Sequence, residues 1–446
     1  MKGNGSWARL RGGLMVTVVA VFVLTPGAWA AAKYKSLHNF TGGKGGGFLS
    51  SALIFDQAGN LYGTAYAGGS CRTGNCGLVF ELTPDGRGGW KEKALYRFKG
   101  GTDGSNPYAS LIFDAAGNLY GTTVIGGAYN SGVVFKLAAN TDGSWTETVL
   151  YSFCSLTNCR DGSFPEAALV LDQAGNFYGT AYEGGNLSAC DGVGCGVVFR
   201  LAQNASGGWV ETVLYAFCSI TGCLDGALPS ARVIFDQVGS LYGSTQSGGD
   251  CHSQSCSGVV FKLKPQADGS WTENVLYSFC SQTKCHDGID PFGLVFDGAG
   301  NLYGMTAAGG NRYGNCNHEE PGCGLVFELM PKANGKWAES VLYRFTSVGG
   351  NNPSGDGPLI FDQAENLYGT TSYGGNTKCS GEGCGVVFEL STQPTGGWKK
   401  TVLYRFTDVG GSHPSAGLIF DAVGNLYGTT FGDRVKTFGS VFEITP

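Results

Sequence analysis

The sequence predicts an all-β fold: a closed, seven-bladed β-propeller with four strands per blade, in which an N-terminal strand closes the ring. Three observations lead to this prediction: a motif that returns seven times, four strand-like segments in each repeat, and a chain that begins with the segment its end lacks. Internal repeats of this length indicate a repeat architecture. The repeats are centred on the tyrosine of LYG, written FYG in the third copy: Tyr62, Tyr120, Tyr178, Tyr242, Tyr303, Tyr368 and Tyr427.

Each repeat divides into four segments of strand character. In the first copy these are ALIFD (52–56), NLYGTAY (60–66), GLVFEL (77–82) and WKEKALYRF (90–98). All four are short, rich in β-branched and aromatic residues, and bounded by Gly, Asp, Asn or Pro, which is typical of strands. Four strands in about sixty residues are typical of a propeller blade.

The DQAG segment between the first two strands predicts a hairpin turn. Asp favours the first position of a type I turn, and Gly favours the left-handed position that follows. Glu365 replaces this glycine in the sixth copy, at an expected conformational cost of roughly 1 kcal/mol. We assign the repeated Tyr and Asn residues to the scaffold, because seven symmetric positions rarely form one asymmetric site.

The two ends of the chain predict how the ring closes. The seventh copy stops at Pro446, after its third strand, and KYKSLHNFTGG (33–43) matches a fourth strand. Leu37 and Phe40 align with Leu95 and Phe98 of the first copy. Closing the ring removes open sheet edges, which otherwise promote aggregation.

Residues 1–30 are expected to be a signal peptide, and residues 31–446 the propeller. Three basic residues precede an apolar run (14–24), and Ala28-Trp29-Ala30 is a cleavage motif. The signal contains no acidic residue, so the net charge of −6 becomes −9 after its removal. An acidic chain without a basic block is poorly suited to nucleic acids or anionic membranes. No second apolar segment is long enough to span a membrane, and we expect a monomer.

The repeated pattern LIFDxxGNLYGTTxxGGxxxxGxVFxL, followed by ETVLYxF, resembles the Gloeo/Verruco-type (GloVer) extracellular tandem repeat of choice-of-anchor proteins. The resemblance covers nearly all of residues 33–446. It implies a secreted bacterial repeat protein, but no known reaction and no catalytic residues. Family members often end in an anchor segment, whereas this chain ends in GSVFEITP, which favours free secretion or periplasmic residence.

The cysteines predict local disulfides. All sixteen form closely spaced pairs, seven with four intervening residues and one with six. Even, paired cysteines in a secreted chain indicate disulfides, and the spacing argues against zinc. The expected pairs lie in loops on one face, which we call the stapled face: Cys71/Cys76, Cys154/Cys159, Cys190/Cys195, Cys218/Cys223, Cys251/Cys256, Cys280/Cys285, Cys316/Cys323 and Cys379/Cys384.

Several polar and aromatic residues of the stapled face are candidates for binding. Asp103, Asp161, Asp225 and Asp287 begin repeated DGxxP loops; they suit ordinary turns, or a carboxylate ring at the channel mouth that could hold Ca²⁺. We otherwise expect no cofactor and no bound metal. Tyrosines near the GG loops suit sugar stacking or a protein partner, whereas burial between blades is the alternative for the first three: Tyr66, Tyr182, Tyr373, Tyr129 and Tyr313.

Three histidines fall in neighbouring loops of this face, with carboxylates beside them in the sequence. Histidine with carboxylates could bind a transition metal or act as general acid and base, while solvated loop residues are the plainer interpretation. The group consists of Asp250, His252, His286, Asp287, Asp290, His318, Glu319 and Glu320.

Two functional hypotheses remain. The first is a secreted binding or structural module whose stapled face holds a glycan or an envelope protein. The second is a secreted lyase or hydrolase acting on a polysaccharide or a lactone, with a polar site at the channel mouth. The sequence contains no G-x-S-x-G, H-E-x-x-H, P-loop or Rossmann motif, and its paired cysteines leave no expected thiol nucleophile.

Overall fold

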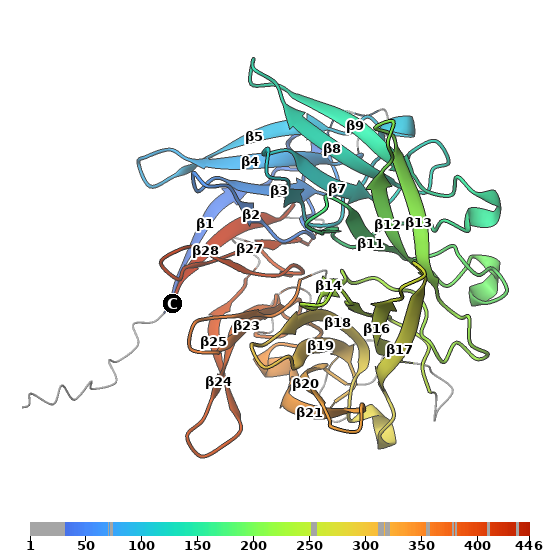
Figure 1. Cartoon of the computed structure of the whole chain (residues 1–446). Coiled ribbons are helices and arrows are strands. Elements are labelled where there is room, and N and C mark those ends of the chain that lie inside the picture. Colours follow the sequence, from blue (N-terminus) through green and yellow to red (C-terminus); the bar gives the residue numbers. More distant parts are fainter. Residues whose placement is uncertain are drawn as a thin grey trace, which may run out of the picture.

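The computed structural model describes residues 32–446 apart from 70, 72–74, 251–256, 311–315, 317–321, 354–356, 377–378, 380, 408–410 and 434–436. The expected signal peptide lies outside the described residues. The chain forms seven four-stranded antiparallel sheets arranged as the blades of a ring (Figure 1). This confirms the predicted seven-bladed propeller.

The first six blades follow the chain in order, each from its innermost to its outermost strand. Blades 1 to 3 consist of β2 (Ile54–Phe55), β3 (Leu61–Ala65), β4 (Leu78–Pro84) and β5 (Trp90–Arg97); β6 (Ile112–Phe113), β7 (Leu119–Thr123), β8 (Val133–Ala139) and β9 (Trp145–Ser152); and β10 (Val170–Leu171), β11 (Phe177–Ala181), β12 (Val197–Gln203) and β13 (Trp209–Ala216). Blades 4 to 6 consist of β14 (Ile234–Phe235), β15 (Leu241–Ser244), β16 (Val259–Pro265) and β17 (Trp271–Ser278); β18 (Ile289–Phe296), β19 (Leu302–Ala308), β20 (Leu325–Pro331) and β21 (Trp337–Arg344); and β22 (Ile360–Phe361), β23 (Leu367–Thr371), β24 (Val386–Thr392) and β25 (Trp398–Arg405). In Figure 1, β14 and β18 lie near the middle of the ring, and β9, β13 and β17 lie at its edge.

Blade 7 joins the two ends of the chain. Its inner strands are β26 (Ile419–Phe420), β27 (Leu426–Thr430) and β28 (Ser440–Thr445), and its outermost strand is β1 (Lys33–Asn39). The closing strand also contacts both neighbouring blades. The ring of Tyr34 stacks on that of Tyr404 in blade 6 with 4.0 Å between centroids, and Phe40 lies 5.0 Å from Phe80 in blade 1.

The innermost strands are shorter than the sequence predicts. Six of them contain only two residues, because the residues directly before each strand are irregular and do not pair with the second strand. The exception is β18, whose blade has one residue fewer between Pro291 and Leu294 than blade 4 has between Pro229 and Val233. The shorter connection lets pairing with β19 extend to Ile289, with one register shift.

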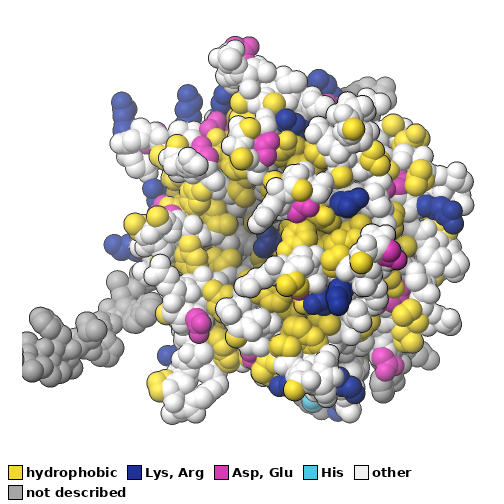
Figure 2. Space-filling view, in the orientation of Figure 1, with side chains coloured by type: hydrophobic (Ala, Val, Ile, Leu, Met, Phe, Trp, Pro, Cys, Tyr) yellow, Lys and Arg dark blue, Asp and Glu magenta, His cyan; other side chains and the backbone are white. Residues whose placement is uncertain are grey.

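Among the described residues, the only helical elements are short 3-10 turns in the loops: η1 (Gly43–Gly45), η2 (Gly101–Asp103), η3 (Thr157–Cys159), η4 (Cys190–Gly192), η5 (Thr283–Cys285) and η6 (Ser347–Gly349). No helix in the described part of the chain has the length and hydrophobicity needed to cross a bilayer. On the face shown in Figure 2, hydrophobic side chains gather toward the middle, and charged side chains lie scattered among them and along the rim.

A repeated Asp-Asn-Tyr motif, in which blade 4 has Ser240 in place of Asn, fixes the hairpin that opens each blade. The Asp56 carboxylate accepts hydrogen bonds from the backbone N–H groups of Ala58 and Asn60 at 2.9 and 2.8 Å. It also accepts from Asn60 Nδ2 at 2.8 Å and the Tyr62 hydroxyl at 3.1 Å. Burial alone would raise the pKa of Asp56, but these hydrogen bonds lower it below its ordinary value. The repeated residues therefore serve the scaffold, as the sequence predicts.

A closed belt of phenylalanines holds neighbouring blades together. One ring follows or ends the outermost strand of a blade, and the other lies in the third strand of the next blade. The centroid distances in all seven pairs lie between 4.9 and 5.2 Å: Phe40–Phe80, Phe98–Phe135, Phe153–Phe199, Phe217–Phe261, Phe279–Phe327, Phe345–Phe388 and Phe406–Phe442. Tilted and edge-to-face pairs of this kind contribute about 0.5–1.5 kcal/mol each beyond the area that they bury. We call this arrangement the phenylalanine belt.

Candidate functional site

Seven residues with left-handed backbone conformation occupy equivalent positions, one in each blade of the ring. Six of them lie six to eight residues before the innermost strand of a blade, Asp290 is the second residue of β18, and none is a glycine. Their φ angles lie between 47° and 59°, a region that residues other than glycine rarely adopt. We call them the axial ring: Phe48, Asn106, Phe164, Leu228, Asp290, Asn352 and His413.

The backbone of the axial ring is held in the same way from blade to blade. The Asn106 N–H donates to the carbonyl of Cys76 in the preceding blade at 2.8 Å, and the Asn106 carbonyl accepts from Val124 of its own blade at 3.1 Å. Phe164 is held in the same way by Ser131 and Tyr182. The fold therefore fixes the position of each residue, while the side chain differs from blade to blade.

Tyr182 connects three blades on one side of the axial ring. It follows the second strand of blade 3, and its hydroxyl donates to Gln246 Oε1 of blade 4 at 3.1 Å. Burial raises the pKa of Tyr182, and the charges of Glu166, Asp290 and Glu183 raise it further. Tyr182 thus lies among carboxylates from blades 3 and 5 and an amide from blade 4.

Glu166 is the group on this side that is best suited to proton transfer near neutral pH. It follows the axial-ring residue of blade 3 by two positions. Burial, together with the charge of Glu183, raises the pKa of Glu166 to about 7. Burial also raises the pKa of Glu183. A carboxyl group in this range can accept hydrogen bonds from a ligand or exchange a proton with it.

Aromatic rings gather on the other side of the axial ring, in blades 6, 7, 1 and 2. Phe48 lies 5.3 Å from Phe431 between centroids. Tyr373 meets His413 at 5.1 Å, and the His413 Nδ1 lies 3.2 Å from the Gly432 carbonyl. Burial lowers the pKa of His413, although the carbonyl and nearby carboxylates oppose the shift. Tyr66 and Tyr108 add a further edge-to-face pair at 6.0 Å.

The aspartates of the DGxxP loops do not surround the axis, which corrects the expectation of a carboxylate ring at the channel mouth. Asp161 is fully buried and accepts from the hydroxyl of Tyr151, in the outermost strand β9, at 2.6 Å. It also accepts from the backbone N–H groups of Ser155 and Leu156. Each such carboxylate stabilises its own loop beside a different outer strand, so they cannot share one cation. The others are Asp103, Asp225 and Asp287.

Of the expected histidine group, the described part of the chain contains His286 and the carboxylates of Asp250, Asp287 and Asp290. His286 is exposed, and its carbonyl accepts from Arg344 Nη2 at 3.1 Å. Asp290 belongs to the axial ring, and Tyr129 is 53% exposed. The remaining candidates lie outside the described residues: His252, His318, Glu319, Glu320 and Tyr313.

The expected disulfide bonds are present in the described residues, and each joins two cysteines of one loop. They are Cys71–Cys76, Cys154–Cys159, Cys190–Cys195, Cys218–Cys223, Cys280–Cys285, Cys316–Cys323 and Cys379–Cys384. Cys251 and Cys256 lie outside the described residues.

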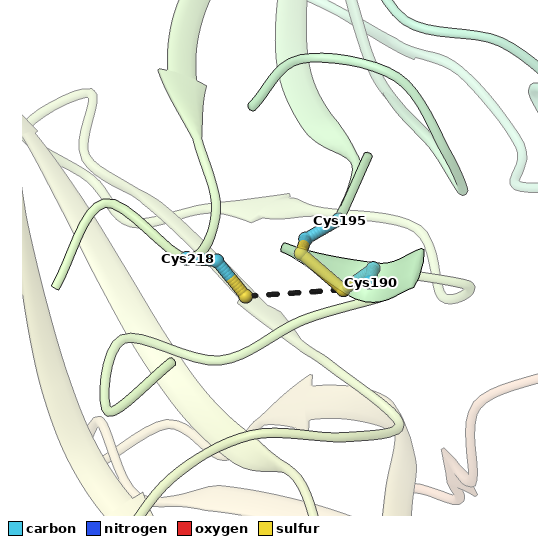
Figure 3. Close-up of side chains that lie close together, drawn as sticks. All are labelled: Cys190, Cys195 and Cys218. Carbon is cyan, nitrogen blue, oxygen red and sulfur yellow. Dashed lines mark hydrogen bonds between the residues drawn. A yellow bond between two sulfur atoms is a disulfide. The ribbon is translucent and has the colours of Figure 1, made fainter. Parts of the chain in front are cut away.

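In blade 3, the Cys190–Cys195 disulfide lies beside Cys218, which is bonded to Cys223 in the next stapled loop (Figure 3). The Cys190 and Cys218 sulfurs, from two different loops, are 3.9 Å apart. Cys190, Cys195 and Cys218 form the one close group of three metal-ligating residue types in the described part of the chain. Their sulfurs are already bonded in disulfides, so the group links two loops of the stapled face and is not a metal centre.

The repeat pattern of the chain matches one family model twice. The matches to the Gloeobacter/Verrucomicrobia repeat cover residues 10–255 and 252–446. The chain belongs to this family. A search of curated proteins found no significant match.

Solved structures similar to this Gloeobacter/Verrucomicrobia repeat protein share its fold at low identity. The extracellular domain of a one-component system from B. thetaiotaomicron is 13% identical with a TM-score of 0.52; the match covers 94% of this chain and 42% of that one. An ulvan lyase of polysaccharide lyase family PL25, bound to -[GlcA(1-4)Rha3S]-, is 10% identical with a TM-score of 0.53, over 91% and 95% of the two chains. The Pseudomonas aeruginosa periplasmic gluconolactonase is 16% identical with a TM-score of 0.47, over 82% and 86%.

Sequence reasoning missed the acidic side of the axial ring in this repeat protein. The seven copies differ from one another at the positions of Glu166, Glu183 and Gln246. The repeat motif is defined by the positions at which the copies agree, so it does not point to these three residues. Aligning the copies and selecting the variable positions beside each innermost strand would have found them.

Proposed function

We propose that this protein is a secreted binding module that holds a carbohydrate at the axial ring. One observation carries the proposal: scaffold positions repeat almost unchanged, whereas the axial ring presents seven side chains of differing chemistry in one strained conformation. Strain of this kind persists where the surrounding structure enforces it, and it concentrates at ligand sites. Loops on a rigid scaffold are also where binding residues usually lie.

The chemistry of the axial ring favours a neutral glycan. Aromatic rings such as Phe48 and Tyr66 offer apolar faces to the C–H groups of a sugar ring, and Glu166 and Gln246 offer oxygen acceptors to its hydroxyls. The carboxylates of Glu183 and Asp290 disfavour an anionic polysaccharide. The disulfides and the expected signal peptide support an extracellular or periplasmic location.

One specific observation favours a second candidate, a hydrolase or lyase acting on a polysaccharide. Glu166, whose pKa is raised to about 7, lies near Tyr182, and a carboxyl group with such a pKa suits general acid-base catalysis. In this case the axial ring would position the substrate and Glu166 would transfer the proton.

Affinity electrophoresis of the mature protein in gels containing xylan, hydroxyethyl cellulose or polygalacturonate would test the proposal. We expect a neutral polysaccharide to retard the wild type but not Tyr182→Ala combined with Gln246→Ala. Asp268→Ala, in the exposed β16–β17 turn of the opposite face, serves as the matched control and should be retarded like the wild type. New reducing ends or unsaturated products would favour the enzyme. Equal mobility in all gels would contradict carbohydrate binding and leave a protein partner as the alternative.

A further inference from the structure

The outermost strands of adjacent blades meet along seven seams, and one position recurs at each seam. It is the third residue of the outermost strand in blades 1 to 6 and the second residue of β1 in blade 7. Five of these residues are glutamates, and the other two are a lysine and a tyrosine: Glu92, Glu147, Glu211, Glu273, Glu339, Lys400 and Tyr34.

At four seams the glutamate faces an aspartate that is already held in place. Asp161 is fully buried and accepts hydrogen bonds from Tyr151, Ser155 and Leu156. The charge of Asp161 acts on Glu211 of the next blade. The same arrangement recurs in three further pairs: Asp103 with Glu147, Asp225 with Glu273, and Asp287 with Glu339.

The glutamate has an oxygen without a donor at each of these four seams. The Oε1 atoms of Glu147, Glu211, Glu273 and Glu339 are buried and have no hydrogen-bond partner among the described residues. A buried carboxylate oxygen without a donor, beside a second carboxylate, is costly. A proton on the glutamate removes one charge and supplies a donor to the aspartate.

The fifth of these interfaces, between blades 5 and 6, carries the opposite charge and serves as an internal control. Its loop has Gly349 where the others have aspartate, and its strand has Lys400 where the others have glutamate. Lys400 Nζ donates to the Gly349 carbonyl and lies 4.8 Å from the centre of the Tyr343 ring. At this seam, a cation takes the place of the glutamate, and the facing loop has a glycine in place of the aspartate.

We propose that each of the four Asp–Glu seams shares one proton near neutral pH, so that the propeller is held together most tightly in mild acid and loosens as the pH rises through neutrality. The inference is independent of the proposed carbohydrate site. It concerns the interfaces between blades, and its failure would leave the axial ring unaffected.

The protonation states of the glutamates set the direction of this effect. Burial first, and then the facing aspartate, raises the pKa of Glu211 and Glu273 to about 8, and of Glu147 and Glu339 to about 7. An unfolded glutamate releases its proton near pH 4.3, so the folded state binds more protons between that pH and about 8. The contribution of these four glutamates to stability therefore falls as the pH rises through this window and is constant above it.

Other charged groups near the seams have weaker or opposite effects. The charge of Lys99 favours the ionised form of Glu147, and that of Arg344 favours the ionised form of Glu339. Both lower the pKa of the glutamate and so narrow the pH range over which stability falls. The seam tyrosines Tyr96, Tyr151, Tyr215 and Tyr277 have pKa values raised by burial and by the aspartates, and they remain protonated throughout. Burial lowers the pKa of His38 and of His413, which gives a gain in stability with rising pH near their ordinary value.

The test is the melting temperature (Tm) of the oxidised mature protein measured from about pH 5 to about pH 8.5. We expect the Tm of the wild type to fall by several degrees over this range. Most of this fall in Tm should disappear when four glutamates are changed together to Gln, because an amide donates a hydrogen bond to the aspartate at every pH. The four are Glu147, Glu211, Glu273 and Glu339. Glu365→Gln, which removes an exposed turn carboxylate, is the matched control and should keep the wild-type slope.

A direct readout of the proton distinguishes this effect from a purely structural one. At about pH 6.5, infrared difference spectra should show protonated carboxyl groups in the wild type that are lost from the fourfold variant. If that variant does not fold, Glu211→Gln alone should remove about a quarter of the slope, since the four seams are similar. A wild-type Tm that is constant or rises with pH, or a wild-type slope retained in the Gln variants, would overturn the proposal.

Discussion

Deleting residues 32–40, which include the closing strand β1, should destabilise the whole ring and not only blade 7. The deletion removes the buried side chains of Leu37 and Phe40, which are 8% and 5% exposed. Burying side chains of this size contributes about 1.5–3 kcal/mol each, or roughly 3–6 kcal/mol together. It also removes the stack of Tyr34 on Tyr404 and the contact of Phe40 with Phe80, each worth about 0.5–1.5 kcal/mol. The expected loss is therefore about 4–9 kcal/mol.

The melting temperature of the mature protein measures this loss. Unfolding about 415 residues has an entropy near 0.9 kcal/mol per kelvin, so the deletion should lower the Tm by roughly 4–10 °C. Light scattering should also reveal self-association, because β28 becomes an open edge strand. The control is Leu37→Ala combined with Phe40→Ala, which should lower the Tm but keep the protein monomeric, since the β1 backbone still covers β28. An unchanged Tm together with a monomeric deletion variant would refute our account of how the ring closes.

Three further predictions concern single positions. Glu365→Gly should stabilise the protein by up to about 1 kcal/mol in thermal unfolding, because Glu365 has φ 62° where the other copies have glycine. Gly59→Ala should destabilise it by a similar amount, about 1 kcal/mol, because an added Cβ there meets nothing within 4 Å and only the backbone conformation opposes it. A loss of stability in Glu365→Gly, or a gain in Gly59→Ala, would contradict the strain. Burial, and then the charge of Arg405, lowers the pKa of Lys400 to about 8, below the ordinary lysine value near 10.4. The folded protein therefore binds fewer protons than the unfolded chain between these two pH values, so the free energy of unfolding should rise with pH in the wild type and stay constant in Lys400→Met. Peptide mapping without reduction should find Cys251 bonded to Cys256, as in the other loops with this spacing; a bond from either cysteine to Cys280 or Cys285 would contradict local pairing.

The scaffold could be predicted from the sequence because it is local and repeated. Asp56, Asn60 and Tyr62 lie within one turn and strand, so their spacing alone indicates the hairpin that the structure contains. The axial ring and the seams could not be predicted in this way. Tyr182 and Gln246 are 64 residues apart, and their contact depends on the angle between two blades. Asp161 and Glu211 belong to different repeats, and only the packing of outermost strands brings them together.

The phenylalanine belt allows blades to be exchanged during evolution. In every blade, the phenylalanine of the third strand contacts the preceding blade, and the phenylalanine that follows the outermost strand contacts the next blade. Because these contacts are the same at every interface, the belt alone does not specify the order of the blades. Duplication, loss or recombination of a whole repeat would therefore keep every such contact at the new junction. Side chains of the axial ring can change in the same events without affecting the belt. A lineage of such chains can thus change the side chains of the axial ring, blade by blade, while the interfaces that keep it folded remain the same.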